Sequence, residues 1–335
     1  MRISENILIS SLTTMRLGGP AKYVIEIEQP AEIPEAYNFA AQQNLPVFIL
    51  GYGANVIGHD DGFNGVILIN RMRGIEIVTG GQIKIMGGEY WDDVVSYTCE
   101  RGLTGIEALS KIPGYAAAAP VQNIGAYGQD ISQTFVSADV YDSAAGTFKT
   151  LGRQDLNFSY RKSALNTTAK GRFFVISITL ALKHGQMPRP FYNSIERHIE
   201  EHAITDFSPQ SIRTIVSAIR AAKLPDPREK ASAGSFFKNI YLTAAEADFA
   251  ESKGYPVHRG QDGNKINSGW LIEQAGFKGA LLHGIRVSPT AALVLINESA
   301  TSYADLAAAR SEIVTKVYDK FGYWLEQEPV EITNK

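Results

Sequence analysis

A serine in an apolar setting is the first candidate for chemistry in this sequence. Ser235 lies between a glycine and two phenylalanines in the segment Ala233–Asn239. In a pocket without water its hydroxyl would be a proton donor, and it could act as a general acid if a neighbouring group favours proton release. A hydroxyl at a strand edge explains the same residues equally well. No histidine lies nearby in sequence and Gly-x-Ser-x-Gly is absent, so a hydrolase-type nucleophile is not indicated.

Two charged residues add to this candidate chemistry. Arg161 ends the segment Phe158-Ser159-Tyr160-Arg161, before a predicted strand. An arginine at such a place is either a surface charge or, if it points inward, a group that binds a carboxylate through two parallel hydrogen bonds. Glu328 lies close to the C-terminus, where the residues alone favour a solvated carboxylate.

The segment 112–128 is rich in glycine and alanine and contains two prolines. It has little bulk to bury, but glycine lets backbone amides approach a ligand closely. The side-chain amides of Gln122 and Asn123 can hydrogen-bond to the edge of a heteroaromatic ring. The segment therefore favours either a loop against a planar cofactor such as a flavin, or a buried turn between domains.

A second glycine-containing turn, 51–55, follows the apolar strand predicted at 47–50. Its amides could form an anion-binding nest for a pyrophosphate. The third glycine of the dinucleotide fingerprint is missing and no helical pattern follows, which disfavours a standard Rossmann site. A plain turn remains an equally good interpretation.

The pattern His198-Ile199-Glu200-Glu201-His202 matches an inverted zinc-protease motif. The segment is strongly charged, however, and is typical of an exposed helix face. We therefore expect no metal here, with a zinc hydrolase as the minor alternative.

Composition narrows the classes of protein further. The 335 residues are 44% hydrophobic and 20% charged, with a formal net charge of −3, which indicates a folded protein without a basic surface for nucleic acid. Cys99 is the single cysteine, so neither an internal disulfide nor a thiolate metal site is expected, and its apolar neighbours indicate core packing. No apolar run reaches the roughly 18 residues that a membrane helix needs, and no signal peptide is evident. We expect a cytoplasmic protein without membrane partners.

The elements that must position these residues form three predicted regions. Apolar spacing predicts strands at 24–27, 47–50 and 66–69 with a helix at 30–43, and then strands at 74–78, 82–86, 136–141 and 173–182 with a helix at 91–100. In the last region, helices are predicted from 209 to 223 after a Ser208 cap, from the capping box at Thr243, over 270–275, and over 302–321 with a hydroxyl cap at Ser302. A strand at 293–296 and an extended tail at 323–332 complete the prediction.

Taken together, these motifs resemble the UDP-N-acetylenolpyruvoylglucosamine reductases, also called UDP-N-acetylmuramate dehydrogenases. The resemblance covers nearly the whole chain, with the motifs in the family's order. The matching segments are 51–55, 112–128, 160–161, 223–227, 233–239, 269–272 and the tail around Glu328.

The resemblance implies an α+β fold of three domains. Two would form a vanillyl-alcohol-oxidase-like fold that binds FAD without a covalent link, and the third would bind the substrate. The expected boundaries are 1–70 with the tail 322–335 returning to it, 71–206, and 207–321. It also implies a monomer in which NADPH reduces FAD, and a hydride then passes to the enolpyruvyl group of a UDP-sugar in peptidoglycan precursor synthesis.

The resemblance also assigns residues. Arg161 and Glu328 would stabilise an enolate-like substrate, and Ser235 would protonate the neighbouring carbon. Tyr192, which matches the tyrosine of a mobile loop found in one subtype, would hold the UDP-sugar together with Lys223 and Asn239. The residues that match the FAD site are Gly51, Tyr52, Gly53, Ala54, Asn55, Pro113, Gly114, Tyr115, Gln122, Asn123, Gly125, Ala126 and Tyr127.

The chain departs from the family pattern at several of these motifs. Ala54 replaces a serine, Tyr115 a threonine or cysteine, and Ala117 a glycine. Gln327 stands where proline is usual, and Ala291 where glutamine or histidine is common. Two further interpretations are a flavin oxidoreductase of the same superfamily with a different substrate, and a non-catalytic paralogue that only binds a nucleotide sugar.

Overall fold

The computed structural model describes residues 1–78, 81–260 and 263–334 and divides into two compact units. Unit 1 comprises residues 1–7, 21–52 and 64–222, and unit 2 comprises residues 8–20, 53–63 and 223–335. The chain therefore passes between the units four times within its first 64 residues. The finer division into three domains stays a prediction.

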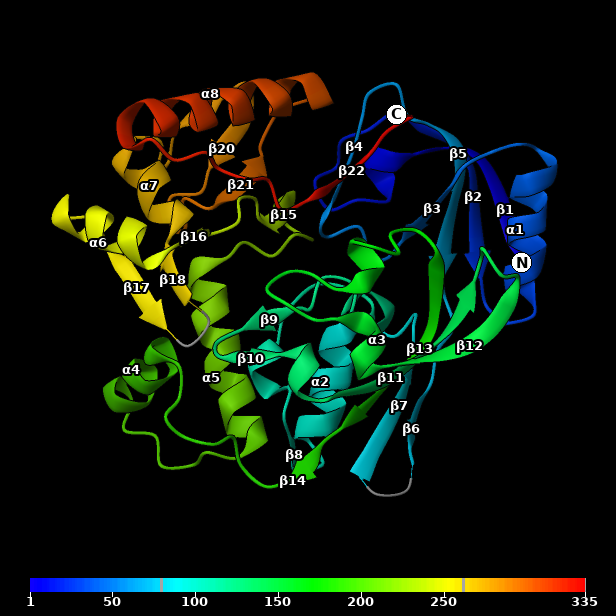
Figure 1. Ribbon diagram of the computed structural model, residues 1–335, viewed down its shortest axis with the longest axis horizontal. Coiled ribbons are helices and arrows are strands. Elements are labelled where there is room, and N and C mark those ends of the chain that lie inside the picture. Colours follow the sequence, from blue (N-terminus) through cyan, green and yellow to red (C-terminus); the bar gives the residue numbers. More distant parts are fainter. Residues whose placement is uncertain (79–80, 261–262, 335) are drawn as a thin grey trace. The chain divides into compact units, whose positions relative to one another are not determined.

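The first sheet of unit 1 has the strand order β1-β2-β5-β3 (Figure 1). Its elements are β1 (Arg2–Leu8), β2 (Pro20–Ile27), α1 (Glu32–Gln42), β3 (Val47–Leu50) and β5 (Phe63–Asn70). Strands β3 and β5 are parallel, as expected when a helix precedes the first and a crossover joins them. Ile33 and Ala40 of α1 are buried against Val66 and Leu68 of β5, which confirms the apolar face predicted for this helix.

The second sheet of unit 1 is antiparallel, with the order β12-β11-β13-β7-β6. Its strands are β6 (Ile75–Ile77), β7 (Gln82–Met86), β11 (Phe135–Asp142), β12 (Thr147–Gly152) and β13 (Phe173–Ala181). The helices α2 (Trp91–Cys99) and α3 (Arg153–Leu156) contribute to the core on this sheet. Cys99 is buried in that core, and burial raises the pKa of its thiol to about 12, so the predicted packing role is confirmed.

Smaller elements complete unit 1. They are β8 (Leu103–Thr104), β9 (Gly125–Ala126), β10 (Gln129–Asp130), β14 (Lys183–His184), α4 (Asn193–Glu201) and α5 (Pro209–Lys223), with single 3₁₀ turns at Glu107–Leu109, Ala116–Ala118, Ile131–Gln133 and Ala164–Asn166. The apolar stripe of α5 packs on Ile195 and Ile199 of α4. The hydroxyl of Ser208 accepts a hydrogen bond from the Ser211 amide, as its predicted capping role requires.

Unit 2 contains one four-stranded sheet, a three-stranded sheet and a strand pair. The four-stranded order is β15-β21-β20-β19, and the three-stranded order is β16-β18-β17. The elements are β4 (Val56–Gly58), β15 (Ser232–Ser235), β16 (Ile240–Leu242), α6 (Ala244–Ser252), β17 (Val257–Gly260), β18 (Gly263–Ile266), α7 (Ser268–Gln274), β19 (Leu281–Leu282), β20 (Ile285–Val287), β21 (Val294–Asn297), α8 (Tyr303–Phe321) and β22 (Val330–Ile332), with a 3₁₀ turn at Ile9–Ser11.

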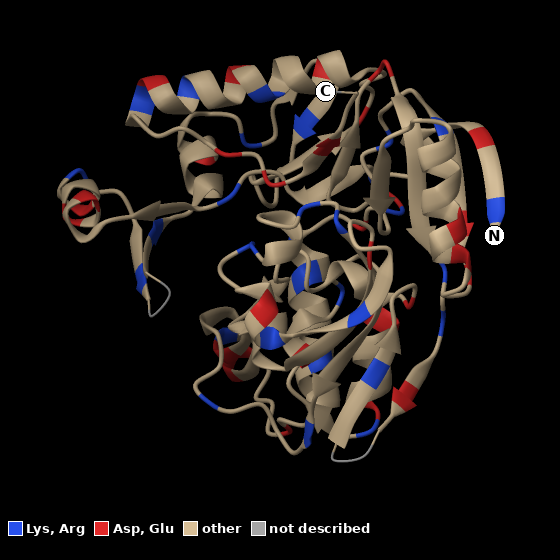
Figure 2. Cartoon of the chain, turned by 45° about the vertical axis from the view of Figure 1, so that its right-hand side comes forward, with Lys and Arg blue, Asp and Glu red and all other residues tan. Residues whose placement is uncertain are grey.

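The C-terminal tail is tied into unit 2 by strand pairing. β22, red in Figure 1, pairs in parallel with β4, although the two are separated by most of the chain. The long helix α8 begins after the predicted hydroxyl cap at Ser302, which forms a capping box with Asp305, and ends at Gly322, which has a left-handed φ of 76°. Acidic and basic residues both occur along α8 (Figure 2). Within the described part of the chain, no helix is both long enough and apolar enough to cross a bilayer.

Candidate active site

The two glycine-containing segments predicted to hold a cofactor meet in unit 1. A Cβ placed on Gly51 would lie 3.4 Å from the Cβ of Ala118, so the turn after β3 touches the 3₁₀ turn of the segment 112–128. The amides of Ala116 and Ala117 donate to the carbonyls of Glu89 and Gly87 at 2.8 and 2.9 Å. The departure from glycine at position 117 thus leaves the loop anchored through its backbone.

Gly114 gives this loop an open side. A Cβ added there meets none of the described atoms within 4 Å, and its φ is not in the left-handed region. In the turn 51–55, Gly53 has a φ of 77°, and a Cβ there would lie 2.1 Å from the carbonyl oxygen of Leu12. Glycine is therefore required at 53 by the fold, whereas at 114 it leaves space that a flat group can approach.

Tyr115 is accommodated inside an aromatic cluster. Its ring is only 4% exposed and lies 5.6 Å from the ring of Tyr52 and 5.2 Å from that of Tyr90. Its hydroxyl accepts a hydrogen bond from Arg71, and Arg73 lies 4.4 Å from the centre of the Tyr90 ring. Burial raises the pKa of Tyr115. The bulk added at this position is taken up by protein side chains of unit 1.

The side chain of Asn123 supports the loop from within. Its Nδ2 donates to the carbonyl of Ser159 at 3.2 Å, and its Oδ1 accepts from the amide of Ser132 at 3.1 Å. Next to it, Gly125 and Ala126 form β9, which pairs with β10. The amide group of Asn123 is thus engaged in the protein, so its contact with a cofactor stays a prediction, as do those of Gln122 and Pro113.

Arginines gather beside the same loop. A Cβ on Gly125 would lie 3.5 Å from Nη1 of Arg161, which places that guanidinium against the glycine segment. Arg220, on α5, hydrogen-bonds to Tyr127 and is close enough to Arg161 for the two charges to interact. Burial lowers the pKa of Arg220, and its Nε is buried with no hydrogen-bond partner among the described residues. Tyr192 meets the same group, with its ring 5.8 Å from that of Tyr127.

Arg220 is a candidate that sequence analysis missed. The apolar stripe of α5 predicted the helix, but it did not indicate that the helix also carries functional arginines. Arg213 and Arg220 are seven residues apart, which puts both on one face of a helix. Arg213 is buried and binds Asp92 through two hydrogen bonds of 2.6 and 3.1 Å. Two arginines repeated seven residues apart, next to the apolar stripe of the helix, could have signalled this site.

In unit 2 the backbone brings the candidate acid and the candidate carboxylate together. The amide of Glu328 donates to the carbonyl of Phe236 at 2.9 Å, and the amide of Lys238 donates to that of Glu326 at 2.8 Å. Ser235, at the end of β15, is the residue before Phe236, and both Ser235 and Glu328 are half-buried. Ser235 and Glu328, which are 93 positions apart in the sequence, therefore lie on neighbouring hydrogen-bonded segments.

The other predicted substrate residues are separate from this bridge. Asn239 accepts a hydrogen bond from the amide of Ser268 at 3.2 Å, and the carbonyl of Lys223 accepts one from Thr290 at 2.8 Å. The Lys223 side chain is exposed. Unit 2 thus holds Ser235, Glu328, Asn239 and Lys223, whereas Arg161 and Tyr192 belong to unit 1.

The His198 and His202 pair shows no further ligand. The two rings are stacked with centres 4.1 Å apart, and Nδ1 of His202 hydrogen-bonds to the His198 carbonyl at 2.9 Å. The described residues contain no group of three histidine, cysteine or carboxylate side chains that could hold a metal ion. The geometry of the described residues therefore does not support a zinc hydrolase.

The residues of unit 1 fit a flavin dinucleotide. Gly114 leaves open space, Gly51 lies against Ala118 at the start of the turn after β3, and Arg161 and Arg220 supply positive charge beside the loop. The missing hydroxyl at Ala54 leaves such contacts to backbone amides. A model for an FAD binding domain matches residues 21–152, which include both glycine-containing segments.

Comparisons with known proteins extend this match to the rest of the chain. A model for the C-terminal domain of UDP-N-acetylenolpyruvoylglucosamine reductase matches residues 226–332. The reductase of that name from Burkholderia multivorans is 35% identical over 331 residues, covering 96% of this chain and 95% of the relative. The one from Ralstonia nicotianae is 36% identical over 334 residues, covering 95% and 96%.

Solved structures support the same fold. The UDP-N-acetylenolpyruvylglucosamine reductase from Thermus caldophilus aligns with a TM-score of 0.71 at 22% identity, covering 99% of this chain and all of that chain. The 6-hydroxy-D-nicotine oxidase from Arthrobacter nicotinovorans aligns with a TM-score of 0.55 at 12% identity, covering 93% and 84%. These similarities confirm the predicted α+β, oxidase-like FAD-binding fold.

Proposed function

Since this chain belongs to the family of UDP-N-acetylenolpyruvoylglucosamine reductases and is an FAD-dependent oxidoreductase, we propose that it uses NADPH to reduce UDP-N-acetyl-3-O-(1-carboxyvinyl)-glucosamine to UDP-N-acetylmuramate. This reaction would supply a precursor of peptidoglycan in the cytoplasm, and the protein would act as a monomer. The observation that carries the proposal is the bridge between Phe237 and Gln327, because it gives Ser235 and Glu328, the candidate proton donor and carboxylate, neighbouring backbone positions.

FAD, when bound, supplies the hydride that adds to one carbon of the enolpyruvyl double bond. The chain must then stabilise the negative charge that develops on the substrate and deliver a proton to the adjacent carbon, so that one hydride and one proton complete the reduction. In this proposal the Ser235 hydroxyl donates the proton, and Arg161 and Glu328 interact with the charged group. A serine is a weak acid, but an enolate-like carbanion is a strong enough base to accept its proton.

Substrate binding would use the remaining polar residues. Lys223 and Arg220 are cations suited to the diphosphate and carboxylate of the substrate, and Tyr192 and Asn239 can hydrogen-bond to the nucleotide sugar. Tyr192 is 48% exposed, which leaves its hydroxyl accessible to a ligand. Burial of Arg220 without a partner for Nε supports a role in binding an anion, because such a donor is costly to leave unsatisfied.

Absorption spectroscopy of the purified protein tests the proposal. We expect the bands of oxidised flavin, bleached by NADPH and restored by the enolpyruvyl UDP-sugar. Bleaching that this sugar does not reverse would favour a flavin oxidoreductase with another substrate. A protein that stays colourless after incubation with excess FAD would contradict the assignment and favour the non-catalytic paralogue.

A further inference from the structure

The segment that carries Glu328 crosses the Ser235 strand in a distinctive way. Gln327 is paired with Phe237 in an antiparallel bridge, and the two bridge hydrogen bonds use the residues on either side, Glu326 and Glu328. The backbone N–H of Gln327 therefore takes no part in the bridge. In such a non-hydrogen-bonded pair the side chains of the two opposed residues lie closer together than in a hydrogen-bonded pair.

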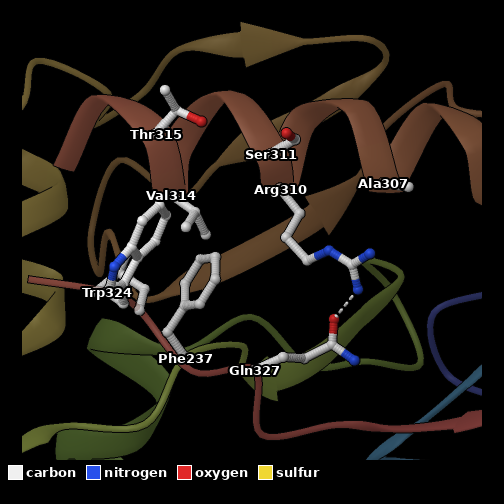
Figure 3. Close-up of a pocket in the computed structure, with 9 residues that line it drawn as sticks. Phe237, Ala307, Arg310, Ser311, Val314, Thr315, Trp324 and Gln327 are labelled. Carbon is white, nitrogen blue, oxygen red and sulfur yellow. Dashed lines mark hydrogen bonds between the residues drawn. The ribbon is translucent and has the colours of Figure 1, made fainter. Parts of the chain in front are cut away.

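Both ends of the Gln327 side chain are hydrogen-bonded. Its Oε1 accepts from Nη1 of Arg310, a contact drawn as a dashed line in Figure 3. Its Nε2 donates to the carbonyl of Pro329 at 2.8 Å and to Oε1 of Glu331 at 3.2 Å. The side chain thus spans the backbone on both sides of Glu328 and fixes the course of the chain there.

Arg310 and Glu331 tie this side chain to two other elements. Arg310 comes from α8 and donates to Oε1 of Glu331 at 2.6 Å and to the Tyr303 hydroxyl at 3.2 Å. Glu331 lies on β22 and is also hydrogen-bonded to Nε2 of His59 and to the Tyr303 hydroxyl, both at 2.9 Å. We refer to Gln327, Arg310, Glu331, Tyr303 and His59 as the tail network.

A cavity borders this part of the tail on the α8 side. It has a volume of about 380 Å³, with Gln327 and Arg310 in its wall and the ring of Phe237 between them and Trp324 (Figure 3). Phe237 and Leu325 are buried in the core of unit 2, whereas Trp324 is 62% exposed. Packing therefore holds the tail at Leu325, and the hydrogen bonds of the tail network hold the Gln327 side chain at the cavity wall.

We propose that Gln327, held by Arg310, is a positioning residue that fixes the Glu328 carboxylate relative to the Ser235 hydroxyl. A proline at this position would restrict the backbone by the fixed φ of its ring. Here the side-chain bonds of Gln327 supply the same restriction. A proline would lose no bridge hydrogen bond, since the Gln327 N–H forms none. This inference rests on the proposed roles of Ser235 and Glu328.

Rapid-reaction kinetics on the FAD-loaded protein test it with two substitutions at one position. In Gln327→Ala, reoxidation of the reduced protein by the enolpyruvyl UDP-sugar should slow by about tenfold, because a small displacement of reacting groups is costly in rate. The KM for the sugar should change less than about twofold, and reduction by NADPH should keep its rate, because Gln327 is not expected to contact either ligand. Gln327→Pro should restore reoxidation to within about threefold of the unaltered protein.

Glu326→Gln is the matched control. Glu326 is the preceding residue, its side chain is 72% exposed, and its ion pair with Lys238 lies at the surface, so its loss should leave both half-reactions unchanged. A purely structural role for Gln327 would lower the melting temperature of Gln327→Ala while leaving reoxidation unchanged, and that result would overturn the inference, as would failure of proline to rescue. Absence of turnover by the unaltered protein would instead overturn the proposed function, and this inference with it.

Discussion

The cofactor segments of unit 1 and the Phe237–Gln327 bridge of unit 2, which joins the segments of Ser235 and Glu328, are built by different means. Around 112–128, the shape depends on backbone: small residues, amides bonded to Glu89 and Gly87, and a glycine that faces open space. Around Glu328, the shape depends on side chains from distant parts of the chain, namely the tail network and its anchors on α8 and β4.

The two regions should therefore respond differently to substitution. Adding a side-chain atom in the cofactor segments changes the surface that a flat ligand meets, while the fold tolerates it wherever space is open. Removing a side chain from the tail network leaves the local surface intact but loosens a strand. Substitutions in the cofactor segments should therefore affect FAD binding, and substitutions around Glu328 should affect substrate reduction.

The largest effect is expected for Ser235→Ala. Loss of the proton donor should slow reoxidation by the enolpyruvyl UDP-sugar by about 10²- to 10⁴-fold, because general acid catalysis contributes in that range. Reduction by NADPH should be unchanged. Stopped-flow absorbance of each half-reaction measures both. Ser232→Ala, on the same strand, is the control and should retain both rates; a slowed first half-reaction in Ser235→Ala would remove the assigned role.

An intermediate effect is expected for Gly114→Ala. The added methyl group projects into open space, so the unfolding free energy of the apoprotein should stay within about 0.5 kcal/mol. If that space belongs to FAD, the dissociation constant of FAD should rise about tenfold, equivalent to about 1.4 kcal/mol. Fluorescence titration of the apoprotein gives this constant. Gly152→Ala, where the new Cβ would lie 3.6 Å from Asp155, should alter neither quantity. Unchanged FAD affinity in Gly114→Ala would argue against a FAD site beside Gly114.

The smallest effect is expected for the pH dependence of the free energy of unfolding, through the carboxylate of Glu331. Burial by itself raises the pKa of Glu331, but hydrogen bonds with His59, Arg310, Tyr303 and Gln327 outweigh it and lower the pKa from 4.5 to about 2. A lowered folded-state pKa stabilises the fold above pH 4.5, and this contribution is lost as the pH falls towards 2.

In urea unfolding, the free energy of unfolding should therefore be lower at about pH 3 than at about pH 6, by on the order of 1 kcal/mol. In Glu331→Gln this difference between the two pH values should be smaller. Glu326 is an exposed carboxylate of the same segment and serves as the control. Glu326→Gln should lose as much free energy of unfolding between the two pH values as the unaltered protein. Equal pH dependence in the unaltered protein and Glu331→Gln would show that the tail network does not hold Glu331 ionised.

Sequence alone predicted the features that depend on local chemistry. The caps at Ser302 and Thr243 are short-range hydrogen bonds between residues three apart, and both are present. The apolar spacing of Ile33 and Ala40 likewise gave a correct face for α1. β17 and β20 were not predicted, because β17 is largely polar and exposed and β20 is only three residues long.

The tail network could not be predicted for a different reason. His59, Tyr303, Arg310 and Glu331 are each ordinary surface residue types with no local pattern. Their association depends on the parallel pairing of β22 with β4, which joins segments about as far apart as this chain allows. Ser235 was a candidate from its own surroundings in the sequence, and Glu328 was a candidate from the resemblance. The fold adds that the Glu328 amide donates to the carbonyl of Phe236, the residue after Ser235.

The aromatic cluster of unit 1 couples the effects of substitutions at two positions. The rings of Tyr52 and Tyr115 are in contact, and both lie beside the ring of Tyr90. Threonine at 115 alone would leave a hollow beside Tyr52 and Tyr90 and remove the hydroxyl that accepts a hydrogen bond from Arg71. The stability effects of substitutions at 52 and 115 should therefore be non-additive, because the two side chains are in contact.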